Sequence, residues 1–144
     1  MDIICDLDGT LADCEHRRHW IRTNPKNYEA FHLAEDRDTL IAPVAIVIQS
    51  LAWFRHQIIL CSARPESSRE VTEKWLAKHQ IKYAALYMRE NNDSRSGDII
   101  KEELLDRIFA DGFSPMLVFE DRTCVVAMWR RRGLICAQVA DGDF

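Results

Sequence analysis

Five short apolar runs alternate with longer stretches of helical periodicity along this chain, and that alternation limits the folds it can adopt. A strand that is apolar on both faces is typical of a parallel sheet covered on both sides, whereas antiparallel strands usually alternate apolar and polar residues. The runs cover residues 3–5, 58–61, 84–88, 116–119 and 134–139. They predict the five strands of a buried parallel sheet.

Between these runs, apolar residues recur every three or four positions, as on the buried face of a helix. Val44, Ile48 and Leu51 follow this spacing before the second run, and Ile100 and Leu104 follow it before the fourth. The repeated order of strand and helix predicts an α/β fold in which right-handed crossovers join parallel strands. At 144 residues and 47% hydrophobic, the chain has the size of a single domain with its own core.

Residues 14–42 interrupt the alternation, because the loop after a strand in such folds usually takes only a few residues. This insert carries Arg17, Arg18 and Arg22, with Trp20 between them. Ligands of open α/β sheets bind at the carboxyl ends of the strands. One interpretation is therefore a small cap that covers this end of the first strand, and the other is an ordinary solvated helical flap.

The composition limits the partners and the compartment. A net charge of −4 argues against nucleic-acid binding through the overall field of the protein, but it says nothing about a local basic cleft. The five cysteines are odd in number and form no C-x-x-C pair, which indicates reduced thiols. The start of the chain lacks the pattern of a signal peptide, and the longest apolar stretch is too short and broken to span a bilayer. We expect a cytoplasmic protein with no membrane partner.

The sequence DLDGT, from Asp6 to Thr10, directly follows the first apolar run. Asp is a poor strand residue and two nearby carboxylates repel each other, so the pair needs a turn, a cation or a function. Gly9 lets the backbone turn sharply after the strand. Two carboxylates at a strand exit suggest a Mg²⁺ site, although a D-x-D pair can also form a simple Asx-turn.

Three further polar groups follow later elements. Ser62 ends the second run, where its hydroxyl could bond a phosphoryl oxygen or simply cap the next helix. Lys101 falls in the first turn of a helix opened by Asp98, where a cation opposes the helix dipole and hints at a nearby anion. Glu120 and Asp121 form a second acidic pair, after the fourth run.

Taken in order, DLDGT, Ser62, Lys101 and the Glu120-Asp121 pair resemble the four motifs of the haloacid-dehalogenase (HAD) superfamily of aspartyl-phosphate phosphatases. The Ser-Ala-Arg turn at residues 62–64 and the segment EDRTCVVAMWRRRGLICAQVADGDF are similar to the phosphatase domain of phage polynucleotide kinase-3'-phosphatases. This similarity covers nearly the whole chain and is weakest across the insert. No G-x-x-x-x-G-K-[ST] motif occurs, so we expect one HAD phosphatase domain over residues 1–144 and no kinase domain.

The resemblance implies a Rossmann-like HAD fold. Its parallel sheet has five strands in the order 5-4-1-2-3, flanked by helices, and a small helical cap follows the first strand at residues 14–42. Two positions depart from the phage domain. Gly97 stands where that domain has an acid, and Glu120 replaces an Asp.

The resemblance also implies a mechanism. Asp6 would attack phosphorus and form an aspartyl-phosphate, while Asp8 would protonate the leaving oxygen and later take a proton from water. Ser62 and Lys101 would hold phosphoryl oxygens. The cofactor would be Mg²⁺, held by side-chain oxygens and by the backbone carbonyl of the second Asp. Its implied ligands are Asp6, Asp8, Glu120 and Asp121, with Asp121 slightly preferred within the second pair.

Three residues are candidates for substrate binding. Arg17 and Arg64 fall where the phosphatase domain has arginines, and either guanidinium could fork onto a phosphate. Trp20 could stack on a base, because aromatic rings accept any base. All three lie beside the turn that carries Asp6 and Asp8.

The expected activity is Mg²⁺-dependent hydrolysis of phosphorylated DNA or RNA ends, chiefly 3'-phosphates. A phosphatase of free nucleotides or other small phosphomonoesters is the alternative within the same chemistry. A catalytically idle binding module is a third reading, which the retention of Asp6 and Asp8 disfavours. A separate kinase or ligase would be a compatible partner.

Overall fold

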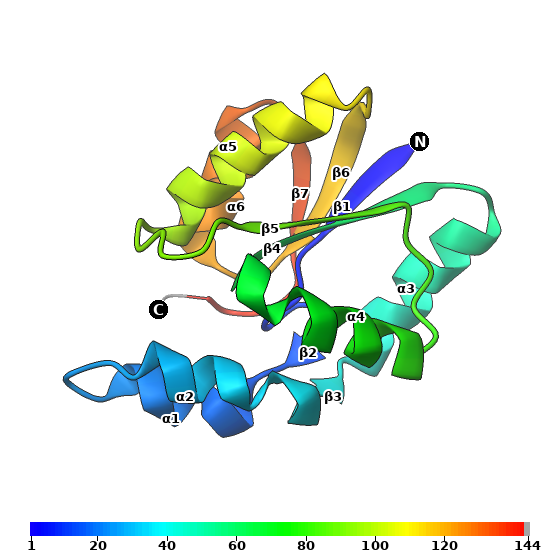
Figure 1. Ribbon diagram of the computed structural model, residues 1–144. Helices are drawn as coiled ribbons and strands as arrows, with labels where there is room; N and C mark the ends of the chain where they lie inside the picture. Colours follow the sequence, from blue (N-terminus) through cyan, green and yellow to red (C-terminus); the bar gives the residue numbers. More distant parts are fainter. Residues whose placement is uncertain (143–144) are drawn as a thin grey trace.

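The computed structural model describes residues 1–142, and its centre is one parallel sheet in the order β5-β4-β1-β6-β7 (Figure 1). All four strand pairings in this sheet are parallel. Read from β7 to β5 and counted along the chain, the order is 5-4-1-2-3, which confirms the expected sheet. The strands are β1 (Asp2–Cys5), β4 (Gln57–Pro65), β5 (Ala85–Arg89), β6 (Pro115–Glu120) and β7 (Ile135–Gln138).

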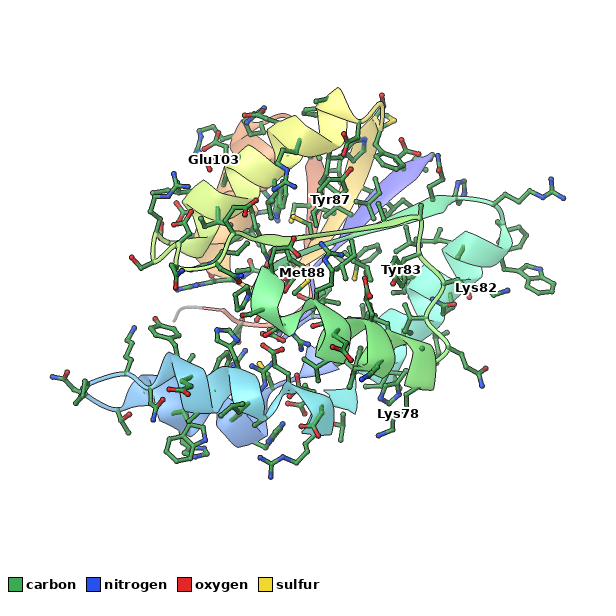
Figure 2. All side chains as sticks on the ribbon, in the orientation of Figure 1. Lys78, Lys82, Tyr83, Tyr87, Met88 and Glu103 are labelled. Atoms are coloured by element: carbon green, nitrogen blue, oxygen red, sulfur yellow. The ribbon has the colours of Figure 1, made fainter. Side chains whose placement is uncertain are left out.

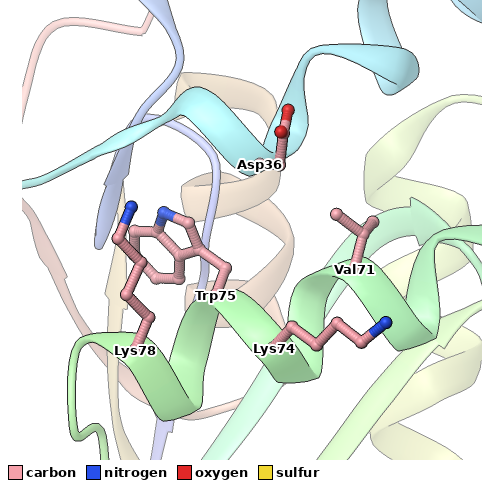
Figure 3. Close-up of a pocket in the computed structure, with 5 residues that line it drawn as sticks. All are labelled: Asp36, Val71, Lys74, Trp75 and Lys78. Atoms are coloured by element: carbon pink, nitrogen blue, oxygen red, sulfur yellow. The ribbon is translucent and has the colours of Figure 1, made fainter.

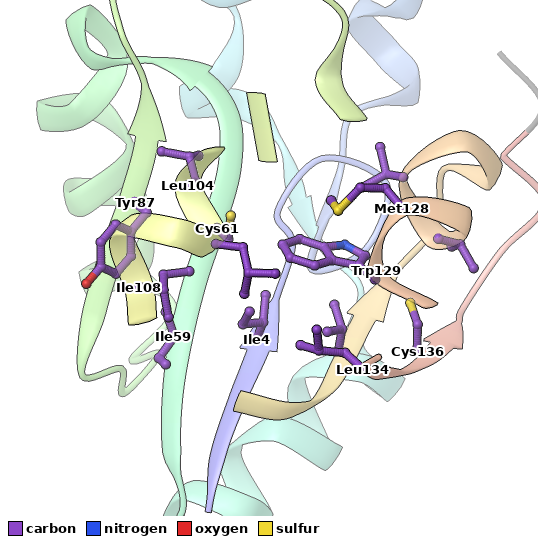
Figure 4. Packing of buried hydrophobic residues seen from close by; sticks show 14 of the residues in the cluster. Ile4, Ile59, Cys61, Tyr87, Leu104, Ile108, Met128, Trp129, Leu134 and Cys136 are labelled. Atoms are coloured by element: carbon purple, nitrogen blue, oxygen red, sulfur yellow. The ribbon is translucent and has the colours of Figure 1, made fainter. Parts of the chain in front are cut away.

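Helices cover both faces of the sheet (Figure 1). The helices α3 (Ala42–Trp53) and α4 (Arg69–Lys78) pack on one face, and α5 (Gly97–Ala110) and α6 (Thr123–Arg131) pack on the other. Neighbouring residues of β1 point to opposite faces of the sheet. Ile3 belongs to the core under α3 and α4, whereas Ile4 belongs to the core under α5 and α6. Figure 4 shows the second core, in which Trp129 of α6 lies beside Ile4 and Leu134.

Two predicted boundaries were wrong. β4 does not end at residue 61 but continues through Ser62 to Pro65, so the serine lies within the strand. α5 begins at Gly97 with Ser96 as its N-cap residue, so Asp98 lies inside its first turn and Lys101 lies beyond that turn. The backbone therefore places Lys101 deeper in the helix than the sequence indicated.

The insert after the first strand forms a helical unit. It contains α1 (Glu15–Arg22), α2 (Tyr28–Leu33) and the 3₁₀ turn η1 (Glu35–Arg37). Its two ends pair with each other as the short antiparallel strands β2 (Ala12–Asp13) and β3 (Thr39–Leu40). In Figure 1 this unit, which we call the cap, lies across the carboxyl ends of the sheet strands.

Four of the five cysteines are buried, and Cys124 is exposed. All five are free thiols. Within residues 1–142, none of the helices has the length and apolar character needed to cross a bilayer.

Candidate active site

Four residues of the predicted site meet at the carboxyl end of the sheet. Asp6 directly follows β1, Glu120 is the last residue of β6, and Asp121 comes next. Lys101 reaches the same place from α5. β1 and β6 are parallel neighbours, so their carboxyl ends lie at one edge and bring distant parts of the sequence together. We call Asp6, Lys101, Glu120 and Asp121 the acidic cluster.

Lys101 holds two of these carboxylates together. Its Nζ donates to Asp6 Oδ1 at 2.6 Å and to Glu120 Oε2 at 2.7 Å. All three residues are buried. Burial would lower the pKa of Lys101, but the charges of Asp6 and Glu120 outweigh that effect and raise it, so the ammonium group keeps its proton.

The positive charge in the acidic cluster does not fully neutralise its carboxylates. Burial and the charge of Glu120 raise the pKa of Asp6 to about 7, although Lys101 opposes this shift. Burial and the charge of Asp6 also raise the pKa of Asp121. Three acids face one ammonium group and, at the longer distance of 3.4 Å from Asp121, the guanidinium of Arg18, and the raised pKa values show that this positive charge does not balance them. The cluster therefore favours a further cation.

The acidic cluster has the oxygen ligands that a divalent ion needs. One carboxylate oxygen from each of Asp6, Glu120 and Asp121 lies within 4.8 Å of the other two, and all three residues are buried. Carboxylate oxygens are the ligands that Mg²⁺ prefers in proteins. The donor set therefore fits the cofactor expected from the sequence.

Glu120 and Asp121 differ in how far their oxygens are already engaged. Glu120 Oε1 accepts from two backbone N–H groups, at 3.2 and 3.3 Å, and Oε2 accepts from Lys101 and from an indole N–H at 3.4 Å. Asp121 accepts from Thr10 Oγ1 and Arg18 Nη2, both at the long distance of 3.4 Å. Asp121 is thus the acid of this pair whose oxygens an incoming ion could take over more easily.

The turn after Asp6 requires a glycine. Gly9 has a φ of +88°, a conformation that side chains rarely adopt, and a Cβ there would collide with the carboxylate of Asp121. The guanidinium of Arg18 lies against the same point. Gly9 therefore lets the turn approach the acidic cluster closely.

The second Asp of the motif belongs to a different set of contacts. Asp8 Oδ1 accepts from Arg17 Nη2 at 2.6 Å and from Arg64 at 2.5 Å (Nη2) and 2.9 Å (Nε). Asp38 accepts from the same arginines, at 2.7 Å from Arg17 Nε and Nη2 and at 2.8 Å from Arg64 Nη2. We call Asp8, Arg17, Asp38 and Arg64 the arginine network. It joins the cap to the core through these ion pairs. Figure 2 shows that side chains fill the space between the cap and the core.

The arginine network sets the protonation of Asp8. Burial alone would raise the pKa of Asp8, but Arg64 and Arg17 lower it to about 2. Arg17 is fully buried and Arg64 nearly so, and both donate to carboxylates. A direct contact between either guanidinium and a substrate phosphate would require these ion pairs to open.

Sequence reasoning missed the cap carboxylates that support this network. Asp38 Oδ1 lies 2.8 Å from His16 Nε2, and the Asp38 carbonyl accepts from Trp75 Nε1 at 2.8 Å. Glu35 is fully buried and lies 2.6 Å from His32 Nδ1. Both acids lie late in the insert, without a strand exit or a motif, so the sequence carried no signal for them.

Two other predicted residues lie in different surroundings. Ser62 is buried, and its Oγ accepts from the Arg64 backbone N–H at 3.2 Å. Trp20 is 38% exposed on α1, and its ring lies 4.6 Å from that of His19. Trp20 can therefore meet a ligand from solvent, whereas Ser62 is closed to solvent and contacts its own strand.

Neither of two small cavities in the structure is lined by the acidic cluster. One, of about 150 Å³, lies between η1 and α4 and is lined by Asp36 of η1 and by Val71, Lys74, Trp75 and Lys78 of α4 (Figure 3). The other, of about 290 Å³, lies at the opposite end of the sheet and includes Gln57 and Ile58 at the start of β4. The chemistry of the charged groups, and not cavity size, identifies the candidate site.

Comparison with known families gives a match along the whole chain. Residues 1–144 match the model of the family described as "Polynucleotide kinase PNKP phosphatase domain". A protein of Autographa californica nuclear polyhedrosis virus, named as a bifunctional polynucleotide kinase/RNA ligase, is 30% identical over 130 residues. That match covers 89% of this chain and 17% of the viral protein.

Solved structures agree with that match. A chain in the structure of the Pnkp1/Rnl/Hen1 RNA repair complex is 39% identical, with a TM-score of 0.86, over 99% of this chain and 43% of the other. A haloacid dehalogenase-like protein of Streptococcus pneumoniae shares the fold at 12% identity and a TM-score of 0.69, covering 95% of this chain and 83% of its own. This chain thus spans less than half of the length of its two more similar relatives.

Proposed function

We propose, because the chain belongs to the polynucleotide kinase PNKP phosphatase domain family, that it removes the 3'-phosphate from polynucleotide ends through an aspartyl-phosphate intermediate. Family membership and the shared fold make the chain a phosphatase of the HAD superfamily. The observation that carries the finer proposal is the acidic cluster, which gathers a carboxylate nucleophile, a buried ammonium group and two further acids at one edge of the sheet.

The first chemical step uses Asp6 as the nucleophile. A carboxylate oxygen of Asp6 forms a bond to phosphorus while the bond between phosphorus and the 3'-oxygen breaks, and that oxygen leaves with a proton. Lys101 Nζ, 2.6 Å from Asp6, would then lie close enough to hold a phosphoryl oxygen and to offset its charge. Ser62 would bond a second phosphoryl oxygen from β4.

The second step releases phosphate. Water attacks the phosphorus of the aspartyl-phosphate, the bond between Asp6 and phosphorus breaks, and Asp8 takes a proton from the water. Asp8 is suited to this base role as it stands, because its pKa is lowered to about 2 and it is ionised at neutral pH. To act first as the acid, Asp8 must leave Arg17 and Arg64 and gain a proton once the substrate has entered.

The proposed cofactor is Mg²⁺, with Asp6, Asp121 and the backbone carbonyl of Asp8 as ligands and Glu120 holding Lys101 in place. When bound, the ion would offset the repulsion between the Asp6 carboxylate and the negatively charged phosphate. The excess negative charge of the acidic cluster supports this assignment. Asp6 and Glu120 must share Lys101, and a single ammonium group does not neutralise both.

The wider setting of the reaction is also a proposal. One relative is named as a polynucleotide kinase/RNA ligase and another comes from an RNA repair complex, and both extend well beyond the region matched here. We propose that this phosphatase acts together with a kinase or a ligase that processes the same ends. Removal of a 3'-phosphate leaves the 3'-hydroxyl that end-joining chemistry uses as a nucleophile.

The test compares initial rates of phosphate release from a 3'-phosphorylated oligonucleotide, its 5'-phosphorylated isomer and mononucleotides, each with and without Mg²⁺. We expect the highest kcat/KM for the 3'-phosphorylated oligonucleotide, no release without the metal, and no release by Asp6→Asn. Higher kcat/KM for mononucleotides would replace the polynucleotide with a small phosphomonoester as substrate. Substantial turnover by pure Asp6→Asn would end the assignment of the nucleophile.

A further inference from the structure

Two arginines flank the loop between β5 and α5. Arg89 is the last residue of β5 and lies beside Pro65 at the end of β4. Arg122 directly follows Asp121 and approaches Gly97, the first residue of α5. These two arginines thus lie at the same edge of the sheet as the acidic cluster but outside it.

Arg89 is a partly buried cation without a carboxylate partner among residues 1–142. Its Nη1 donates to the backbone carbonyl of Asp93 at 2.9 Å, while its Nε is buried and has no acceptor in the described part of the chain. Arg17 and Arg64 contrast with it, because each donates to two carboxylates. A buried N–H without an acceptor costs free energy, which an anion at this position would recover.

Arg89 has charged neighbours of both signs. Burial lowers the pKa of Arg89; Asp93 and Tyr28 oppose this shift, and the charges of Arg122 and Arg95 add to it. The carboxylate of Asp93 is already bound by Arg95, at 2.6 Å. Tyr28 comes from α2, so the cap and the β5–α5 loop approach each other here. Like charges gathered in a partly buried place are typical of an anion site.

The distance across the sheet separates this position from the reacting phosphate. β5 and β1 lie on opposite sides of β4, so the two strands are about 10 Å apart, two inter-strand spacings, and β5 also extends beyond the level at which β1 ends. Arg89 is also held in its own loop by the bond to the Asp93 carbonyl. A phosphoryl group on Asp6 and an anion on Arg89 are therefore two different groups.

We propose that Arg89, with Arg122 beside it, forms a second anion subsite that binds an internucleotide phosphate of the substrate strand. This inference rests on the proposed function and deepens it. A mononucleotide has one phosphate for the position on Asp6 and none for Arg89, whereas the end of a strand supplies both. The subsite thus selects polynucleotide ends over mononucleotides.

The test uses two 3'-phosphorylated dinucleotides that differ only in their internal linkage, a charged phosphodiester or a neutral methylphosphonate. For the wild type we expect kcat/KM to be about tenfold higher with the charged linkage, because a charge-assisted hydrogen bond is lost in the neutral one. Arg89→Ala should bring this ratio close to one, and Arg89→Lys should restore part of it. The control is Arg107→Ala, an exposed arginine of α5 paired with Glu90, which should keep the wild-type ratio.

A binding experiment separates this inference from the proposed function. The Asp6→Asn protein, with and without Arg89→Ala, is titrated with a fluorescent 3'-phosphorylated single strand at several salt concentrations. Loss of the Arg89 contact should lower the slope of log affinity against log salt by about 0.7. If the wild type hydrolyses no 3'-phosphorylated substrate, the proposed function fails while this slope still tests the subsite. An unchanged slope, or an unchanged linkage ratio in folded Arg89→Ala, overturns the subsite.

Discussion

The acidic cluster and the arginine network both bury charged side chains beside the same DLDGT turn, yet they balance that charge in different ways. In the arginine network, Asp8 and Asp38 face Arg17 and Arg64, so two acids meet two bases at distances of 2.5 to 2.9 Å. In the acidic cluster, Asp6 and Glu120 share the ammonium group of Lys101, Asp121 has only a long contact of 3.4 Å with Arg18, and the pKa values of Asp6 and Asp121 are raised.

This difference separates two tasks. A balanced and saturated set of ion pairs holds two parts of a structure together, because removing any member leaves an uncompensated buried charge. A cluster with more acids than bases favours the binding of a cation and keeps carboxylate oxygens available for chemistry. In the free protein, the turn of residues 6–10 thus places Asp6 in the unbalanced cluster and Asp8 in the balanced network that holds the cap, and the proposed chemistry requires Asp8 to leave that network.

The largest expected effect tests the holding role of the arginine network. Asp38→Asn removes a carboxylate that faces two buried guanidinium groups, and we expect it to lower the free energy of unfolding by about 3–5 kcal/mol. Urea unfolding followed by circular dichroism measures the change. Asp36→Asn is the matched control, because Asp36 is exposed on the same segment and its substitution should change stability by less than about 0.5 kcal/mol. Equal stability of the two variants would contradict the comparison.

The next effect concerns the metal. Asp121→Ala should weaken Mg²⁺ binding about 100-fold, because it removes a direct ligand, whereas Glu120→Ala should weaken it about tenfold by releasing Lys101. Isothermal titration of the metal into each variant gives the affinities without relying on turnover. If Glu120→Ala shows the larger loss, the two acids exchange roles. If both variants bind Mg²⁺ like the wild type, the ion does not bind in the acidic cluster.

A smaller effect is expected from substitutions on α1, whose exposed and buried faces should affect activity differently. Trp20 is 38% exposed, whereas Arg17 on the same helix is fully buried in the arginine network. Trp20→Ala should therefore lower kcat/KM about tenfold for a 3'-phosphorylated oligonucleotide, since stacking contributes about 1–3 kcal/mol per base, and should spare a small artificial phosphomonoester. Arg17→Ala should reduce both activities.

The control for this experiment is Trp53→Ala, an exposed tryptophan at the end of α3 that should affect neither substrate. Equal losses on both substrates in Trp20→Ala would show that Trp20 supports the cap instead of contacting a base.

The smallest expected effect has the opposite sign. In metal-free protein, Asp6→Asn should raise the free energy of unfolding by about 1 kcal/mol at pH 8, because it removes a buried carboxylate whose pKa is raised. The gain is smaller than the full pKa shift would give, because the substitution also loses the ion pair with Lys101. Because the folded-state pKa of Asp6 lies above its ordinary value, its contribution to stability is present below about pH 4 and is lost as the pH rises through about 7. The gain from Asp6→Asn should grow over that range in thermal melts. A destabilised Asp6→Asn would show that Lys101 balances the cluster fully.

The sequence predicted the positions of site residues best where a residue stands at the end of an apolar strand. Asp6 and Glu120 could be placed because each follows an apolar run, and parallel strands end at a common edge. The extent of β4 was less predictable, since Ser62 to Pro65 are held by pairing with β5 and not by their own apolar pattern. The start of α5 was missed by two residues, because Asp98 also suits an N-cap whereas the observed N-cap is Ser96.

The partners of the charged residues were beyond what the sequence could show. Arg17 and Arg64 were identified as functional positions, but their ion pairs with Asp38 depend on how the cap folds back on the core. Asp38 lies 30 residues after Asp8 in an insert without strong periodicity, so no local pattern links the two. For Arg89, the lack of a carboxylate partner among the described residues appears only in three dimensions.

The pairing of β2 with β3 has a consequence for how this molecule can change over evolutionary time. The chain leaves the core at Asp13 and returns at Thr39, and these residues are partners in an antiparallel ladder, so the two junctions lie about 5 Å apart. A segment of almost any length can be spliced between two such adjacent points without stretching the core. Evolution could therefore replace the cap as a unit. Its replacement would change which substrates enter while the acidic cluster stayed the same.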